Sequence, residues 1–120
     1  MSRSYLVGVD LGSGACKLTI LSSDGNVVAT ASKEYPTYYP YPSYAEQEPD
    51  DWYLAVRDTF AEAMTLSGVK AENIAAICVD SATHTAVLTD ESVSLCVEQF
   101  CGQTRGRGER AKNCDPYTRT

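Results

Sequence analysis

The segment from Asp10 to Lys17 reads Asp-Leu-Gly-Ser-Gly-Ala-Cys-Lys and combines a carboxylate, a turn without bulky side chains and a lysine. Glycines let the backbone approach a ligand closely, and turn N–H groups together with the Ser13 hydroxyl can donate to phosphate oxygens. A carboxylate such as Asp10 can hold a hydrated Mg²⁺. The segment therefore favours binding of a nucleotide's terminal phosphates. It matches neither the Walker pattern nor GxGxxG, and a hairpin turn capped by Asp10 explains the same spacing.

A second carboxylate, Asp80, also follows an apolar stretch that predicts a strand. If the strands before Asp10 and Asp80 are parallel neighbours, both carboxylates lie at the same edge of the sheet, where open α/β sheets bind ligands. Two carboxylates at that edge can share a metal ion. A local role explains Asp80 equally well, because an Asp before a turn accepts hydrogen bonds from the backbone that follows, here residues 81–85.

The one histidine, His84, lies in the small and polar segment Ser-Ala-Thr-His-Thr at residues 81–85. From this position an imidazole can donate a hydrogen bond to a hydroxylated ligand or accept one from it, depending on its tautomer. A histidine that is satisfied within its own turn fits the segment as well. No GxSxG segment precedes it, so a hydrolase triad has no support.

Apolar patterns predict the strands that must position these residues. Two apolar runs, Tyr5–Val9 and Ile74–Val79, are typical of strands covered on both faces. Alternating patterns and turn residues, with a turn at residues 23–26, predict further strands over Cys16–Leu21, Val27–Lys33 and Thr85–Thr89.

A helix is predicted from Pro49 to Ser67. Pro49 suits the first turn, two Asp residues follow near the positive end of the helix dipole, and Gly68 ends the helix. The apolar stripe expected to face the core consists of Tyr53, Val56, Phe60, Ala63 and Met64. The three prolines and five tyrosines of residues 35–44 predict an ordered surface loop. This order of elements predicts an α/β fold whose mixed sheet starts with a β-meander.

Length and charge exclude several classes of protein. A chain of 120 residues has room for one modest core and is too short for a two-domain enzyme that closes on a cleft. The net charge of −6 argues against nucleic acid as a partner, since phosphate neutralisation needs clustered Lys and Arg. No apolar run approaches the roughly 20 residues of a membrane span, so we expect no membrane partner and a cytoplasmic location. Five cysteines without a CxxC pair predict neither a disulfide framework nor a metal site.

Four segments, in order, carry a family resemblance. They are the opening Val-Gly-Val-Asp-Leu-Gly-Ser-Gly-Ala-Cys-Lys, the turn Asp-Gly-Asn, residues 44–52 with their Glu-x-x-Pro-x-x-Trp pattern, and Ile-Cys-Val-Asp-Ser-Ala-Thr-His-Thr-Ala-Val-Leu at residues 77–88. Over residues 4–91 the chain resembles the start of an FGGY-family carbohydrate kinase, and it is most similar to xylulokinase-type members. The resemblance implies an actin-like, ribonuclease-H-like ATPase domain, normally followed by a second domain of the same fold. ATP and the sugar meet between the two domains.

The resemblance also implies site residues. The turn after the first strand faces the ATP phosphates and Mg²⁺, so Asp10 is expected to position the metal, and the expected phosphate contacts are Gly12, Ser13, Gly14 and Lys17. A Met-His pair that contacts the sugar in xylulokinases falls on Thr83 and His84. The His is retained and the Met is not, which leaves the sugar open. Trp52 is expected to pack rather than to bind a ligand.

The resemblance ends at Glu91. We therefore expect residues 1–91 to be the N-terminal part of the kinase domain and residues 92–120 to be an aberrant, poorly ordered tail. The family's catalytic Asp and adenosine site belong to later sequence, so we expect this chain to be inactive alone, whereas the intact enzyme phosphorylates a ketose or polyol. An exposed cleft surface favours self-association, or a non-catalytic module completed by a partner chain. A ribonuclease-H-type nuclease with Asp10 and Asp80 as metal ligands is the alternative, although the acidic charge weighs against it.

A shift of the reading frame between about Glu91 and Phe100 is our hypothesis for the glycine- and arginine-rich tail. Residues 100–106 can be encoded as TTC TGT GGA CAG ACC AGA GGN, and reading from the third base yields Leu-Trp-Thr-Asp-Gln-Arg, which resembles the family's segment there. We expect resequencing of the gene across this junction to reveal an insertion or deletion that is not a multiple of three bases. A clean frame with no recoverable downstream kinase sequence contradicts the hypothesis.

Overall fold

The structure, a computed structural model, describes residues 4–93 and 99–100. These residues divide between two compact units. The first comprises residues 4–35 and 50–82, and the second comprises residues 36–49, 83–93 and 99–100. The tail expected over residues 92–120 falls almost entirely outside the described residues, so its conformation stays a prediction.

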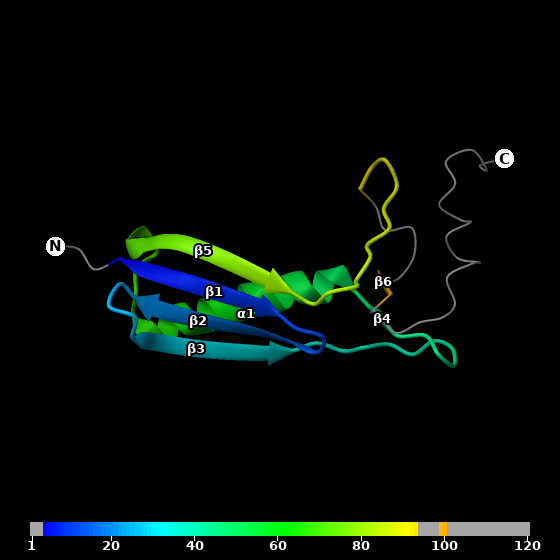
Figure 1. Cartoon of the computed structure of the whole chain (residues 1–120), viewed down its shortest axis with the longest axis horizontal. Coiled ribbons are helices and arrows are strands. Elements are labelled where there is room, and N and C mark those ends of the chain that lie inside the picture. The colour runs from blue at the N-terminus through cyan, green and yellow to red at the C-terminus, as the bar shows by residue number, and fades with distance from the viewer. Residues whose placement is uncertain (1–3, 94–98, 101–120) are drawn as a thin grey trace. The chain divides into compact units, whose positions relative to one another are not determined.

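The first unit is built on a four-stranded sheet with the order β3-β2-β1-β5. Its strands are β1 (Tyr5–Leu11), β2 (Ala15–Ser22), β3 (Val27–Glu34) and β5 (Ile74–Ser81). The first three strands form an antiparallel meander, and β5 joins β1 in parallel (Figure 1). The prediction of a mixed sheet that begins with a β-meander is confirmed.

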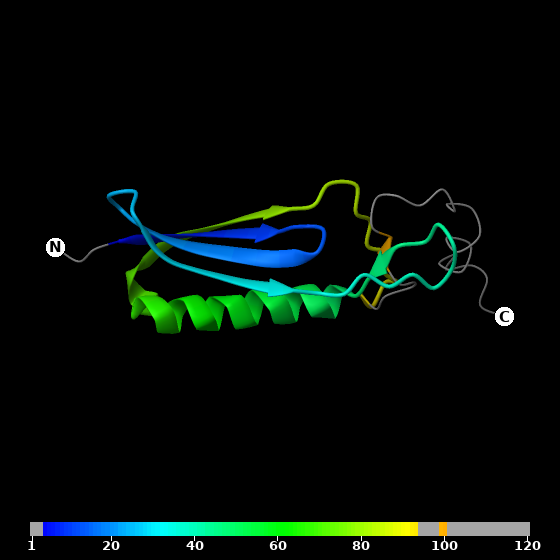
Figure 2. The ribbon, with the colours of Figure 1, turned by 90° about the horizontal axis from the view of Figure 1, so that it is seen from below.

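Helix α1 (Pro49–Ser67) runs along one face of this sheet (Figure 2). Both of its predicted ends are confirmed. Gly68 follows the helix with a φ of +64°, a left-handed conformation that glycine adopts readily, and its N–H donates to the Met64 carbonyl at 3.0 Å. A short 3-10 helix, η1 (Ala71–Asn73), then leads into β5.

The core lies between α1 and the side of the sheet that faces it. Three small residues of the helix, Ala55, Thr59 and Ala63, recur every four positions and are almost completely buried. They belong to the same packed region as Cys16 and Leu18 of β2, and the Thr59 hydroxyl lies 3.4 Å from Cys16 Sγ. The small side chains Ala55 and Ala63 thus form part of the buried core between the helix and the sheet.

The predicted helix stripe is partly wrong. Ala63 is buried, and Val56, Phe60 and Met64 pack half-buried against the core, as does Trp52. Tyr53, in contrast, is 69% exposed. The reason is helix geometry, because Tyr53 lies two residues from buried Ala55 and therefore about 200° around the axis.

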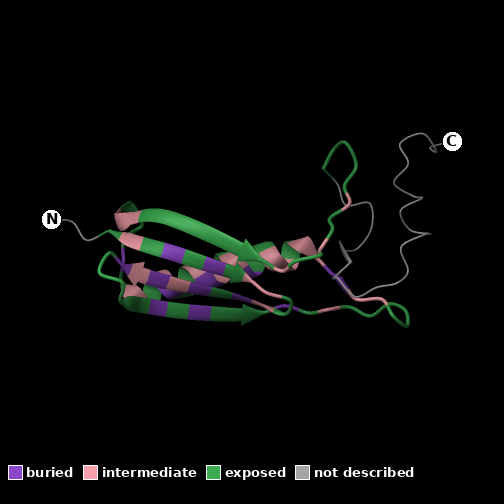
Figure 3. Ribbon diagram, in the orientation of Figure 1, coloured by how far each residue is buried: buried purple, intermediate pink, exposed green. Residues whose placement is uncertain are grey.

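The prediction that β1 and β5 are covered on both faces is wrong. Burial alternates along β1, where Val7 and Val9 are buried and Leu6 is 44% exposed, because α1 covers one face of the sheet (Figure 3). Strand β5 is exposed along almost its whole length, including Ile77 at 55% and Val79 at 58%. It is an edge strand of the described sheet and lies to the side of the buried stripe of α1. Its apolar side chains are therefore not covered by the helix.

The second unit contains a short ladder and the tyrosine-rich loop. Strand β4 (Glu46–Gln47) pairs antiparallel with β6 (Gln99–Phe100). The loop before β4 is confirmed, and it is tied back by two backbone hydrogen bonds of 2.7 and 2.9 Å between Tyr38 and Glu46. The strand predicted over Thr85–Thr89 is wrong, because that segment forms only single bridge residues. Val87, at the centre of this segment, remains 48% exposed.

Two further sequence expectations concern membrane spans and cysteines. In the part of the chain that the structure describes, neither helix is both long and apolar enough to cross a bilayer. Cys16 and Cys78 are free thiols, the first buried and the second exposed, while the remaining three cysteines lie outside the described residues.

An ion pair joins β3 to α1. The Lys33 ammonium donates to the Asp58 carboxylate, which also accepts hydrogen bonds of 2.9 and 2.7 Å from the neighbouring Arg57 guanidinium. Lys33, followed by Arg57, lowers the pKa of Asp58 below its usual value. A carboxylate with a lower pKa in the folded state stabilises the fold at pH values above its unfolded pKa of about 3.9. That contribution is lost as the pH falls through the folded-state pKa.

We therefore expect Asp58→Asn to lower the urea midpoint of unfolding slightly at pH 7. The difference from the wild type should shrink progressively as the pH falls below about 4, and it should also shrink in high salt because the pair is exposed. Glu62→Gln, which removes another exposed carboxylate of α1, is the matched control and should leave the midpoint nearly unchanged. A difference of the same size at pH 7 and pH 3 would contradict this role of the ion pair.

Candidate functional site

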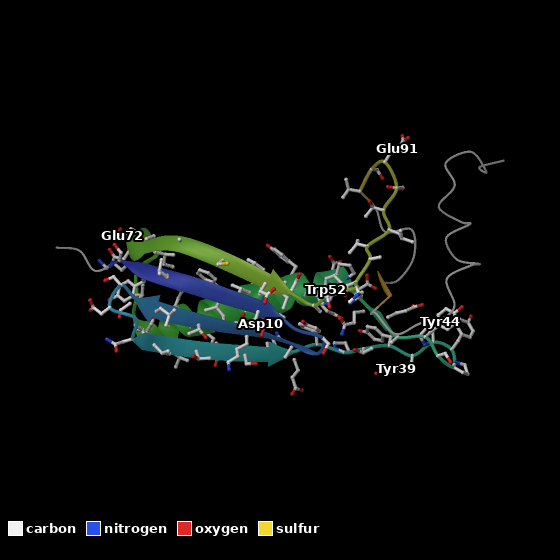
Figure 4. All side chains as sticks on the ribbon, in the orientation of Figure 1. Asp10, Tyr39, Tyr44, Trp52, Glu72 and Glu91 are labelled. Atoms are coloured by element: carbon white, nitrogen blue, oxygen red, sulfur yellow. The ribbon has the colours of Figure 1, made fainter. Side chains whose placement is uncertain are left out.

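Three charged side chains form a row across the sheet face opposite α1. Asp10 on β1 pairs in register with Lys17 on β2 and with Asp80 on β5, and paired residues of neighbouring strands project from the same face. All three are exposed, whereas Val9 and Cys16, next to them in the chain, are buried on the α1 side. Figure 4 shows the Asp10 side chain near the carboxyl end of β1. The prediction that Asp10 and Asp80 lie at the same end of parallel strands is confirmed.

The turn between β1 and β2 lies beyond this row, separated from it by the Leu11–Cys16 pair. The Gly12 N–H donates to the Ala15 carbonyl at 2.9 Å, which closes the hairpin around Ser13 and Gly14. A Cβ added to Gly12 would lie 3.3 Å from the Ala15 oxygen and 4.0 Å from Asp10 Oδ1, so the backbone here passes close to the carboxylate. A Cβ added to Gly14 would meet nothing within 4 Å. Gly12 therefore serves a close approach, and Gly14 leaves the turn open on its outer side.

Tyr35, the residue directly after β3, contacts this turn, which the sequence patterns did not predict. Its hydroxyl donates to the Gly12 carbonyl and lies 3.1 Å from the Ala15 carbonyl oxygen. Its backbone N–H donates to the Gly14 carbonyl at 3.1 Å. In the sequence Tyr35 is only the first of five tyrosines in a loop, and no local pattern marks a hydroxyl that contacts residues 20 and 23 positions earlier.

Asp80 has a local contact as well as a place in the row. Its Oδ1 accepts a hydrogen bond of 2.9 Å from the Ser81 N–H, which agrees with the turn interpretation. The parallel pairing continues beyond the strand, with the Ala82 N–H donating to the Leu11 carbonyl at 2.8 Å. A carboxylate offers about four lone-pair sites, so one local bond is compatible with metal binding.

Thr83 and His84 belong to the second unit, where both are exposed. The His84 Nδ1 lies 3.0 Å from Thr83 Oγ1, and His84 has a φ of +62°, which is uncommon for a residue other than glycine. The local contact uses one ring nitrogen, as the turn interpretation expects. A role for Thr83 and His84 in binding a ligand stays a prediction.

The donor set of the row restricts which metal it can hold. Within residues 4–93 and 99–100, no three side chains of His, Cys, Asp or Glu come together as a metal site. Magnesium is often bound through one or two carboxylates, with water and substrate phosphates completing its shell. The exposed pair of Asp10 and Asp80 fits a hydrated Mg²⁺ that arrives with phosphates, and it does not fit a structural zinc ion.

Comparison with known proteins shows the family of this chain. Residues 5–105 match the N-terminal domain of the FGGY family of carbohydrate kinases, and the chain belongs to this family. It is 36% identical over 87 residues to a xylulose kinase of Bacillus subtilis (strain 168), covering 72% of this chain and 17% of that protein. It is 30% identical over 92 residues to a glycerol kinase of Carboxydothermus hydrogenoformans, covering 77% of this chain and 18% of that protein.

A solved structure shows the same fold. A xyloylose kinase from Brucella ovis aligns with a TM-score of 0.79 at 24% sequence identity, covering 84% of this chain and 22% of that chain. The expected actin-like, ribonuclease-H-like fold of the family's N-terminal domain is thereby confirmed. The chain spans less than a fifth of the length of the two curated relatives it matches.

Proposed function

We propose that this chain contributes the phosphate- and Mg²⁺-binding part of an ATP-dependent carbohydrate kinase similar to a xylulokinase. The observation that carries the proposal is the row of Lys17, Asp10 and Asp80, which lies one residue pair before the turn at residues 12–15. A cation, two carboxylates and a glycine-containing turn are the groups that the terminal phosphates of a metal-bound nucleotide require. The matched relatives are named xylulose kinase and glycerol kinase, which supports a ketose or polyol as the phosphate acceptor.

The proposed reaction transfers the γ-phosphoryl group of ATP. An oxygen of a substrate hydroxyl forms a bond to the γ-phosphorus, the bond from that phosphorus to the β,γ-bridging oxygen breaks, and ADP leaves with the electron pair. The hydroxyl proton passes to a base that we expect outside residues 1–91. Asp10 with Asp80 would hold the Mg²⁺ ion, which would supply charge neutralisation when bound. Lys17 and donors of the turn at Ser13 and Gly14 position the phosphates.

On the acceptor side, we assign Thr83 and His84 to the sugar or polyol. A hydroxyl beside an imidazole offers both a donor and an acceptor to a hydroxylated ligand, and the two side chains already lie 3.0 Å apart. The chain alone should bind these ligands without turning them over, and we place it in the cytoplasm, where its nucleotide is abundant. A ribonuclease-H-type nuclease is not favoured, because the matched family consists of carbohydrate kinases and the net charge is −6.

Titration of MgATP into the ¹⁵N-labelled chain tests the phosphate site. We expect amide shifts centred on residues 12–17, and we expect Asp10→Asn to weaken binding about ten- to a hundredfold, because a charged acceptor contributes roughly 1.5–3 kcal/mol. Asp24→Asn is the matched control, because Asp24 lies in the turn at the opposite end of β2. Shifts that avoid the turn, or an Asp10→Asn chain that binds like the wild type, would contradict the proposed site.

We also propose that isolated copies of this chain self-associate through β5. An edge strand offers unpaired N–H and C=O groups, and charged residues are the usual protection against pairing with another chain. At the opposite edge, β3 carries Lys33 and Glu34, whereas β5 has one charged residue, Asp80, and exposes Ile77 and Val79. The occupant that fits an apolar edge with so little charge is the β5 strand of a second copy.

Sedimentation velocity over a range of concentrations tests the self-association. We expect the wild type to shift from monomer to dimer as its concentration rises and Ile77→Lys to remain monomeric at the same concentrations. Val27→Lys is the matched control, because Val27 is an equally apolar, 64% exposed residue of β3. A monomeric wild type, or an equal effect of both substitutions, would count against pairing through β5.

A further inference from the structure

Tyr35 contacts the glycine-containing turn through both its side chain and its backbone. The hydroxyl donates to the Gly12 carbonyl, with the Ala15 carbonyl oxygen 3.1 Å away, and the Tyr35 N–H donates to the Gly14 carbonyl at 3.1 Å. The phenol ring is anchored, because Tyr35 is 7% exposed and belongs to the buried core cluster. The hydroxyl is therefore held in a fixed position next to the Gly12 and Ala15 carbonyls.

These contacts determine which way the peptide groups of the turn point. In a planar trans peptide, the C=O of one residue and the N–H of the next point in opposite directions, and none of the described peptide bonds is cis. With the Gly12 and Gly14 carbonyls directed toward Tyr35, the N–H groups of Ser13 and Ala15 are directed away from it. This polarity suits an anion, because carbonyl oxygens on the ligand side would repel a phosphate.

The two glycines of the turn make these contacts necessary, because glycine does not fix the backbone conformation by itself. Two glycines in four residues leave the turn free to adopt several backbone conformations, and some of them would present carbonyls to the ligand. The Tyr35 backbone N–H alone holds only the Gly14 carbonyl. The Tyr35 hydroxyl adds a second attachment, 23 positions back in the chain, so that the carbonyls of both glycines are held.

We infer that Tyr35 is a positioning residue, whose hydroxyl holds the turn in the orientation that accepts phosphate. The inference rests on the proposed phosphate-binding function of the turn. It adds a residue that contacts neither the nucleotide nor the metal and acts through the backbone of Gly12. The removal of one hydroxyl should therefore affect phosphate binding more than it affects the fold.

Tyr35→Phe tests the inference, since it keeps the ring and the backbone N–H and removes only the hydroxyl. The probe is inorganic tripolyphosphate with Mg²⁺, titrated into the ¹⁵N-labelled full chain. We expect the dissociation constant to rise about three- to tenfold, as the loss of one net hydrogen bond implies. We also expect the amides of Ser13 and Ala15 to shift and to exchange faster in the absence of ligand.

Two controls separate positioning from stability. Ser22→Ala removes a hydroxyl that contacts Asn26 in the turn at the other end of β2, at 3.3 and 3.4 Å, so it loosens a turn without contacting the candidate site. Tyr39→Phe makes the same chemical change at a 73% exposed tyrosine of the second unit. Both variants should bind tripolyphosphate like the wild type, and Ser22→Ala should do so even where its urea midpoint falls as far as that of Tyr35→Phe.

The outcomes distinguish the two proposals. If the wild type binds and Tyr35→Phe binds equally well with unchanged turn amides, the role of Tyr35 is overturned while the proposed function stands. If Ser22→Ala weakens binding as much as Tyr35→Phe, the effect is one of stability and the positioning role is overturned. A Tyr35→Phe chain that fails to fold also overturns it, because the hydroxyl would then serve the fold. Absence of binding by the wild type overturns both proposals.

Discussion

The parallel pairing of β1 with β5 is the interaction on which the site depends. It brings Asp10 level with Asp80, although β2, β3 and α1 lie between them in the chain. Parallel neighbours cannot be joined by a tight turn, so this intervening connection is a condition of the pairing. Register is equally important. A slip of one residue would turn Asp80 toward the helix side of the sheet and bring the apolar Val79 onto the charged face.

Helix α1 decides what each face of the sheet does. Its stripe of Ala55, Thr59 and Ala63 lies on the face that buries Val9 and Leu18, and this apolar contact holds the first unit together. The other face is left open, and it is there that Lys17, Asp10 and Asp80 are exposed. Charged groups could not occupy the helix side without a large desolvation cost. The division of the sheet into a packed face and an exposed, charged face is therefore a direct result of single-sided coverage.

The turn between β1 and β2 combines a flexible sequence with a held conformation. Gly12 allows a close approach to the Ala15 carbonyl, and Gly14 leaves open space on the outside. Tyr35, anchored in the core, holds the Gly12 carbonyl with its hydroxyl and the Gly14 carbonyl with its backbone N–H. In a member of the FGGY family of carbohydrate kinases this arrangement links the hydrophobic core to the place where phosphates are expected. The Tyr35 side chain thus belongs to the hydrophobic core and also holds the turn.

The sequence by itself determined the strands of the meander, both ends of α1 and the carboxylates that close β1 and β5, because apolar periodicity, proline, glycine and turn residues act over a few neighbouring positions. Its ordered segments were also enough to indicate the family. The sequence did not determine which strands are covered by other elements. The apolar composition of β5 predicted burial, yet Ile77 and Val79 are exposed, because burial depends on which elements pack against a strand. The phase of the helix stripe at Tyr53 and the contact of Tyr35 with Gly12 were likewise decided only by the tertiary structure. Both depend on residues brought together from distant parts of the chain, and no local pattern records which of them will meet.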